Sequence, residues 1–117
     1  MKPLVDVIIP AFNEADSITK VINDIPKDLV REVVVVNNGS LDETEKNAKE
    51  AGATVLKEEL KGYGRACLKG IEYIKSKSTH PEIVVFLDGD YSDYPEEMNK
   101  VIQPIVEKDY NFIEPPD

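Results

Sequence analysis

Short apolar runs alternate along this chain with longer stretches in which apolar residues recur at helical spacing. The short runs are rich in valine and isoleucine, which favour β-strands. They occupy residues 4–10, 31–40, 53–58 and 82–90. The run at 31–40 contains four consecutive valines and the run at 82–90 reads EIVVFLDGD, so we expect both strands to be covered on both faces.

Four other stretches have the spacing of amphipathic helices. They are residues 15–25, 41–52, 62–77 and 94–108. Gly52 is expected to end the second of these helices, and Pro104 to kink the fourth. Residues 109–117 are expected to begin one more strand, which Pro115 and Pro116 stop after a few residues.

This alternation of strands and helices predicts an α/β fold, with a doubly wound parallel sheet that carries helices on both faces. The length of 117 residues is close to the commonest size of one domain, so residues 1–117 are expected to form a single domain. In such sheets ligands bind beyond the carboxyl ends of the strands. Candidate chemistry should therefore be sought at the residues that follow each strand.

Composition narrows the classes of partner. Fourteen basic and twenty-three acidic residues give a net charge of −9, which argues against a nucleic-acid partner. The lone cysteine, Cys67, cannot form an internal disulfide and is expected in the core. The chain contains no run of eighteen apolar residues, so it is expected to be soluble and cytoplasmic.

Polar clusters follow three of the predicted strands. Asn13 and Glu14 follow the first strand, residues 37–40 (NNGS) end the second, and residues 88–90 (DGD) end the fourth. We expect these clusters to meet at one rim of the sheet. The crowded carboxylates of Asp88 and Asp90 are tolerable if they face water or if they share a cation.

Each cluster has an ordinary structural explanation when it is taken alone. NNGS is typical of a turn, in which Asn and Gly tolerate positive φ and Ser40 caps the next helix. Asn13 and Glu14 are typical of a helix cap, and DGD after a strand is usually a turn. The GYGR stretch that begins at Gly62 is a weak phosphate-loop fragment without the Walker lysine.

Four motifs taken together are more specific. VIIPAFNEADSI, VVVNNGSLDET, GYGRACLKGI and VVFLDGDYSDYPEEM occur in this order, each on the expected element. With them the chain resembles the N-terminal, nucleotide-binding half of a family 2 glycosyltransferase, and it is most similar to the branch of dolichyl-phosphate mannosyl- and glucosyltransferases. The resemblance covers residues 4 to about 110. It implies a Rossmann-like nucleotide-diphospho-sugar transferase (GT-A) fold, truncated at its C-terminal side.

The resemblance implies a nucleotide site. In the family, the segment that matches Pro10, Ala11, Phe12, Asn13 and Glu14 cradles the base and the ribose. The turn with Asn38 and Gly39 usually starts with two acidic residues, one of which contacts the base. Both are asparagine here, so the choice between uracil and guanine stays open. The stretch from Lys61 to Arg65, with Lys61, Gly64 and Arg65 as the candidate contacts, is implied to lie beside the nucleotide.

The resemblance also implies a metal site. Asp88, Gly89 and Asp90 match the D-x-D signature of the family. Asp90 would bind Mg²⁺ or Mn²⁺ between the donor phosphates, and Asp88 the ribose or the same ion. The implied reaction transfers sugar from a UDP- or GDP-linked donor to an acceptor, for which a polyprenyl phosphate at the cytoplasmic face of a membrane is the candidate.

Members of the family normally continue for a further hundred residues or so, which supply the acceptor site and any general base. The catalytic base is therefore unknown in this chain. Two alternatives stay open: a non-catalytic nucleotide-sugar-binding module, and a phosphatase of the haloacid dehalogenase type, whose nucleophile motif is also D-x-D. An uncovered sheet edge and apolar helix surface would favour self-association as a homo-oligomer.

Overall fold

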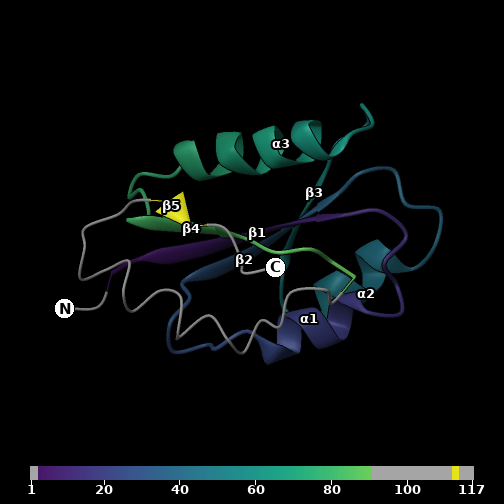
Figure 1. Cartoon of the computed structure of the whole chain (residues 1–117), viewed down its shortest axis with the longest axis horizontal. Coiled ribbons are helices and arrows are strands. Elements are labelled where there is room, and N and C mark those ends of the chain that lie inside the picture. The colour runs from purple at the N-terminus through teal and green to yellow at the C-terminus, as the bar shows by residue number, and fades with distance from the viewer. Residues whose placement is uncertain (1–2, 91–111, 114–117) are drawn as a thin grey trace.

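The described strands form one sheet in which every neighbouring pair is parallel (Figure 1). The computed structural model describes residues 3–90 and 112–113. The order across the sheet is β3 (Thr54–Lys57), β2 (Glu32–Asn37), β1 (Val5–Ala11), β4 (Ile83–Phe86) and β5 (Phe112–Ile113). The predicted α/β class and the parallel sheet are confirmed.

Helices cover both faces of the sheet, as predicted (Figure 1). Helices α1 (Ile18–Asp24) and α2 (Thr44–Glu50) lie on one face, and α3 (Tyr63–Lys75) lies on the other. Successive residues of β1 alternate between the two faces: Val7 and Ile9 belong to the core under α1 and α2, and Ile8 to the core under α3. This alternation explains why the strand is apolar without interruption at these positions.

Helix α3 lies close to the sheet at Gly70. A Cβ atom at this position would lie 2.7 Å from Cγ2 of Ile8, a residue with no exposed surface. Only a residue without a side chain leaves room for this approach. Ala66 and Ile74 are buried on the same side of the helix, and Cys67 packs partly buried against the same core.

Apart from β1, the described helices and strands are shorter than the sequence pattern predicts. Helix α1 begins at Ile18 instead of residue 15, and α2 at Thr44 instead of residue 41. Strand β2 ends at Asn37, and β4 ends at Phe86, four residues before the predicted end. In each case the polar residues beyond the element form loop contacts with another strand end and leave the regular backbone pattern.

Gly52 ends α2 as predicted. It has φ 98°, and its N–H donates to the carbonyl of Lys49 while that of Ala53 donates to the carbonyl of Ala48. These two bonds make a Schellman motif, in which glycine accepts the left-handed conformation without strain. Ser40 does not cap α2, as the ordinary turn explanation of NNGS would have it: its hydroxyl accepts a hydrogen bond from Asn13 N–H, and Asp42 accepts from Thr44 N–H.

The predicted helix 94–108, including Pro104, lies outside the described residues. Of the predicted strand in 109–117, Phe112 and Ile113 are described, and they pair in parallel with Val84 and Val85 of β4. The expectation of a single domain over residues 1–117 stays a prediction. Within the described parts of the chain, no helix is long and apolar enough to cross a lipid bilayer.

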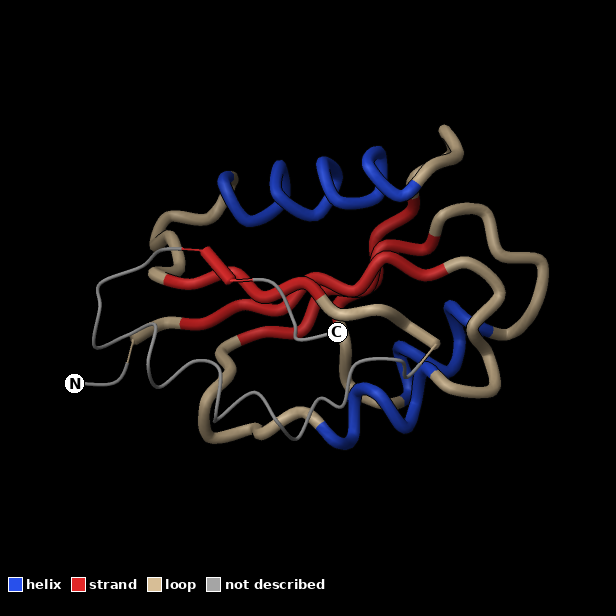
Figure 2. The backbone as a smooth tube through the Cα atoms, in the orientation of Figure 1, coloured by secondary structure: helices blue, strands red, loops and turns tan. Residues whose placement is uncertain are grey.

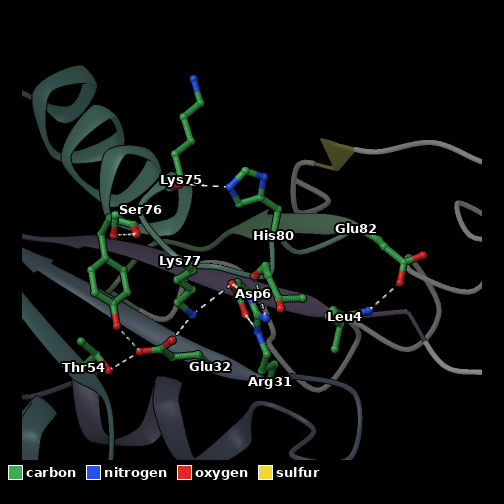
Figure 3. Close-up of polar contacts among 12 residues, drawn as sticks. Leu4, Asp6, Arg31, Glu32, Thr54, Lys75, Ser76, Lys77, His80 and Glu82 are labelled. Atoms are coloured by element: carbon green, nitrogen blue, oxygen red, sulfur yellow. Dashed lines mark hydrogen bonds and ion pairs between the residues drawn. The ribbon is translucent and has the colours of Figure 1, made fainter.

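A network of charged side chains joins the amino ends of β1 and β2 to the end of α3 (Figure 3). Asp6, fully buried in β1, accepts hydrogen bonds of 2.7 and 3.0 Å from Arg31 and one of 3.3 Å from Lys77. Lys77 also pairs with Glu32, which accepts from Thr54 and Tyr73. The network lies at the opposite end of the sheet from the polar clusters, so it holds the scaffold and leaves the other rim for ligands.

Candidate nucleotide-binding site

Residues that follow β1, β2 and β4 lie together at the carboxyl ends of the strands. The loops after β1 and β2 leave the sheet at the same end (Figure 2). A cavity of about 310 Å³ opens there. Eight of the residues expected in a nucleotide or metal site line it: Pro10, Ala11, Phe12, Glu14, Asn38, Asp88, Gly89 and Asp90. Residues from three separate strand ends therefore meet at one cavity, as predicted.

Hydrogen bonds hold the loops after β1 and β2 against each other. The N–H of Asn13 donates to Ser40 Oγ at 2.9 Å, and Oδ1 of Asn13 accepts from Leu41 N–H at 2.8 Å. Next along the chain, Glu14 N–H donates to Thr44 Oγ1 at 2.8 Å. Asn13 has φ 54°, a conformation that asparagine adopts more readily than most residues. Asn13 therefore shapes the rim and does not line the cavity.

The other expected residues outside the cavity lining are Gly39, Lys61, Gly64 and Arg65. Gly39 has φ 83° and supplies the turn after β2. The ammonium of Lys61 lies 5.0 Å from the ring centre of Phe12, which is 45% exposed, so it stands at the cavity mouth as a cation–π partner. Gly64 and Arg65 are exposed in the first turn of α3.

The Asp88–Asp90 turn is fixed by packing and by one hydrogen bond. Gly89 is buried, and a Cβ atom there would lie 3.1 Å from Cγ of Glu14, which leaves little room for a side chain. The carbonyl oxygen of Gly89 accepts a 2.5 Å hydrogen bond from Ser17 Oγ, which precedes α1. The two flanking carboxylates are thus presented to the cavity by a backbone that is held on both sides.

The cavity is strongly acidic. Burial raises the pKa of Glu14, and the nearby charge of Asp90 raises it further, followed by Asp42 and Asp88. The hydrogen bond from Ser17 acts in the opposite direction. A free diphosphate would be repelled by so many carboxylates, whereas a divalent cation would be attracted.

The oxygen donors present fit Mg²⁺ or Mn²⁺. Asp88 and Asp90 line the same cavity, and hard divalent cations prefer carboxylate oxygens. Within the described residues, no group of three or more His, Cys, Asp or Glu side chains could hold a metal ion alone. In the usual magnesium site, one or two carboxylates share the ion with substrate phosphates and water.

Asn38 makes contacts that the sequence did not predict. Its side-chain N–H groups donate to the carbonyls of Glu58 and Leu60 at 3.0 and 2.9 Å, and its Oδ1 accepts from Gly62 N–H at 2.9 Å. The residue is only 8% exposed. Asn38 therefore joins the end of β2 to the loop that leads into α3.

Sequence reasoning missed two residues of the site, Ala66 and Ser17, and it did not single out a third, Tyr63, within the Lys61–Arg65 stretch that it placed beside the nucleotide. Tyr63 and Ala66, from the first turns of α3, line the cavity, and Ser17 holds the Asp88–Asp90 turn. The helical pattern placed Tyr63 and Ala66 on a helix, but it did not predict how close this helix lies to the strand ends. No local signal distinguishes Ser17, because its partner lies 72 residues away along the chain.

Comparisons with known proteins agree with this geometry. The sequence profile of the family described as "Glycosyl transferase family 2" matches residues 6–114. An uncharacterised protein of Methanocaldococcus jannaschii is 32% identical over 107 residues, which cover 91% of this chain and 43% of that protein. A UDP-N-acetylglucosamine–dolichyl-phosphate N-acetylglucosaminyltransferase of Methanococcus voltae is 28% identical, with coverage of 94% and 50%.

Solved structures show the same fold. Glucosyl-3-phosphoglycerate synthase from Mycobacterium tuberculosis, crystallised with Mn²⁺, UDP and glucosyl-3-phosphoglycerate, superposes with a TM-score of 0.74 and 30% identity. The match covers 88% of this chain and 39% of the synthase chain. The predicted GT-A fold is thereby confirmed. This chain spans half or less of the length of these relatives.

The family match also decides between the glycosyltransferase and the haloacid dehalogenase interpretations of the sequence. Because the profile spans the D-x-D residues together with the other three motifs, it replaces the haloacid dehalogenase interpretation of Asp88 and Asp90. The profile match, the relatives and the superposed structures all lead to the same assignment. The chain belongs to glycosyl transferase family 2.

Proposed function

We propose that this chain binds a nucleoside-diphosphate sugar, UDP- or GDP-linked, in the cavity at the carboxyl ends of β1, β2 and β4, and that it is the donor-binding part of a glycosyltransferase. The observation that carries the proposal is that Asp88 and Asp90 line the same cavity as the segment from Pro10 to Glu14. One side of the cavity offers carboxylates for a metal–diphosphate unit, and the other offers an exposed aromatic side chain, Phe12, for the nucleoside.

Each part of the site has a separate role in this proposal. Asp88 and Asp90 hold Mg²⁺ or Mn²⁺ against the diphosphate, and Glu14 adds to the negative potential that attracts the ion. When bound, the metal ion neutralises the charge that develops on the departing nucleoside diphosphate. Gly89, pinned by Ser17, keeps the two carboxylates at fixed places, so that binding does not have to order the turn.

The comparisons support the donor side more closely than the acceptor side. The M. tuberculosis synthase was crystallised with Mn²⁺ and UDP, and it superposes on this sheet. The name of the M. voltae relative gives a dolichyl phosphate as its acceptor. We therefore propose a lipid-linked phosphate as the acceptor class for the whole protein. Self-association remains an expectation that sedimentation would test.

Calorimetric titration tests the donor site directly. UDP and GDP are titrated into the wild type and Asp90→Asn, with Mn²⁺ and with a chelator. The wild type is expected to bind a nucleotide only with metal. Asp90→Asn is expected to lose about 1–3 kcal/mol of that binding, the scale for removal of a charged partner. Asp28→Asn, the same change at an exposed position on the chain, serves as the matched control.

Two results would contradict the proposal. Equal nucleotide affinity with metal and with chelator would show that Asp88 and Asp90 belong to an ordinary solvated turn. An equal loss in Asp28→Asn would assign the effect to net charge. Should the donor bind but never be hydrolysed or transferred in the presence of acceptor lipid, the non-catalytic binding module becomes the better description.

A further inference from the structure

The side chain of Asn38 has almost no hydrogen-bonding capacity left for a ligand. A primary amide has two N–H donors and one carbonyl oxygen with two lone pairs. Both donors are taken by the main-chain carbonyls of Glu58 and Leu60, and Oδ1 accepts from Gly62 N–H. A single lone pair on Oδ1 remains. A nucleobase edge that needs a donor from this residue would have to break an existing bond first.

These three bonds fix the segment that forms one side of the cavity mouth. They reach residues 58, 60 and 62, and the segment between them carries Lys61, whose ammonium lies over Phe12. Tyr63, which lines the cavity, follows immediately as the first residue of α3. Gly62 has φ 127°, a backbone conformation that glycine adopts without strain. The direction of the N–H that donates to Asn38 Oδ1 therefore depends on a glycine at position 62.

We propose that Asn38 is a positioning residue: it holds the Leu60–Tyr63 segment against the nucleotide cavity, and it does not select the base. This inference rests on the proposed donor-binding function. It deepens that function, because nucleotide affinity then depends on the order of this loop, while base selectivity must come from other groups.

The chemistry of position 38 explains why an amide is present. An aspartate has the same shape, but it has no N–H to donate, so its carboxylate would face the carbonyl oxygens of Glu58 and Leu60. Those contacts would change from attractive to repulsive, and burial at 8% exposure would add a desolvation cost. The segment would then leave the cavity.

The test combines two variants and two readouts. Asn38→Asp removes both donors and adds a charge, and Asn38→Ala removes the whole clamp without a charge. Asn23→Asp, on the exposed side of α1, makes the same amide-to-acid change outside the site. Amide hydrogen exchange at Gly62 reports loop order without ligand. Titration of UDP and GDP with Mn²⁺ reports affinity and the UDP-to-GDP ratio.

Both variants at position 38 are expected to exchange the Gly62 amide about tenfold faster or more, because alanine removes its acceptor and aspartate repels the carbonyls that hold the segment in place. Both should weaken UDP and GDP by the same factor, about five- to tenfold, which corresponds to the loss of about one hydrogen bond. The UDP-to-GDP ratio should stay within about twofold of the wild type. Asn23→Asp should change none of these quantities.

Three results would overturn the inference. A change in the UDP-to-GDP ratio would make Asn38 a reader of the base. Weaker binding in Asn38→Asp alone, with Gly62 still protected, would assign the loss to added charge. A wild type that binds neither nucleotide would defeat the proposed function as well, whereas the first two results leave that function intact. Should Asn38→Asp fail to fold by circular dichroism, Asn38→Ala carries the test by itself.

Discussion

The hydroxyl of Ser17 donates a 2.5 Å hydrogen bond to the carbonyl oxygen of Gly89 and so joins the start of α1 to the turn that carries Asp88 and Asp90. The two residues are 72 positions apart in the chain. The bond constrains the backbone between the two carboxylates. The geometry of the proposed metal site therefore depends on a side chain that does not line the cavity.

Ser17→Ala should weaken metal-dependent nucleotide binding, because the turn that carries Asp88 and Asp90 loses a hydrogen bond. Loss of one hydrogen bond costs about 1 kcal/mol, which is roughly fivefold in affinity. Titration of UDP with and without Mn²⁺ checks the expected result. Ser76→Ala is the matched control, because Ser76 also donates to a main-chain carbonyl, that of Tyr73, at the far end of α3 (Figure 3). Equal nucleotide affinities for the two variants would contradict a positioning role for Ser17.

Gly70→Ala should destabilise the fold although alanine favours helices. The added methyl group would lie 2.7 Å from Cγ2 of the fully buried Ile8, and overpacking of a core typically costs about 1–3 kcal/mol. Gly64→Ala is the opposite case, because nothing lies within 4 Å of a Cβ atom added at this position. This variant should gain up to about 1 kcal/mol in free energy of unfolding. Urea unfolding of both variants measures the difference. A stabilised Gly70→Ala would show that α3 is free to move away from the sheet.

Asp6→Ala should be among the most damaging single substitutions in the described part of the chain. The carboxylate is fully buried and pairs with Arg31 and Lys77, and removal of one partner of a buried pair costs about 3–5 kcal/mol. Asp24→Ala removes a carboxylate from the exposed pair with Lys20, which contributes at most about 1 kcal/mol. Chemical denaturation at neutral pH measures the free energy of unfolding of both variants. Similar losses of stability would show that the Asp6 network is not stabilising.

Stability should fall in acid partly through Glu32. Burial raises the pKa of Glu32, but hydrogen bonds from Lys77, Thr54 and Tyr73 outweigh this, so the pKa lies below its ordinary value of 4.5. A depressed pKa means that the ionised carboxylate stabilises the fold above about pH 4.5, and that this stabilisation is lost as the pH falls through the folded-state pKa. Glu32→Gln should therefore be less stable than the wild type at pH 7.

The free energies of unfolding of Glu32→Gln and the wild type should approach each other as the pH is lowered below about 4.5, since both then carry a neutral side chain. Denaturation curves recorded from about pH 3 to pH 7, in steps on the order of one pH unit, measure this convergence. A stability difference that does not change with pH would assign the effect of the substitution to packing.

The alternation of apolar runs and amphipathic stretches is enough by itself to determine the fold class. Val7, Ile8 and Ile9 are apolar in succession because the sheet is covered on both faces, and this is a local signal that a sequence carries. The same alternation placed Glu14, Asn38 and Asp88 at strand ends. Since the carboxyl ends of parallel strands meet at one rim, their meeting at one cavity was also predictable.

The tertiary structure alone decided which polar side chains face the cavity and which hold its walls. Asn38 and Ser17 act on segments more than 20 positions away, and such pairings depend on how the loops approach after the sheet has formed. Sequence spacing reports the geometry within a helix or strand, but the approach of two loops depends on packing across the whole sheet. For this reason the sequence predicted a nucleotide rim, and only the fold distinguished its ligand-facing residues from the ones that position them.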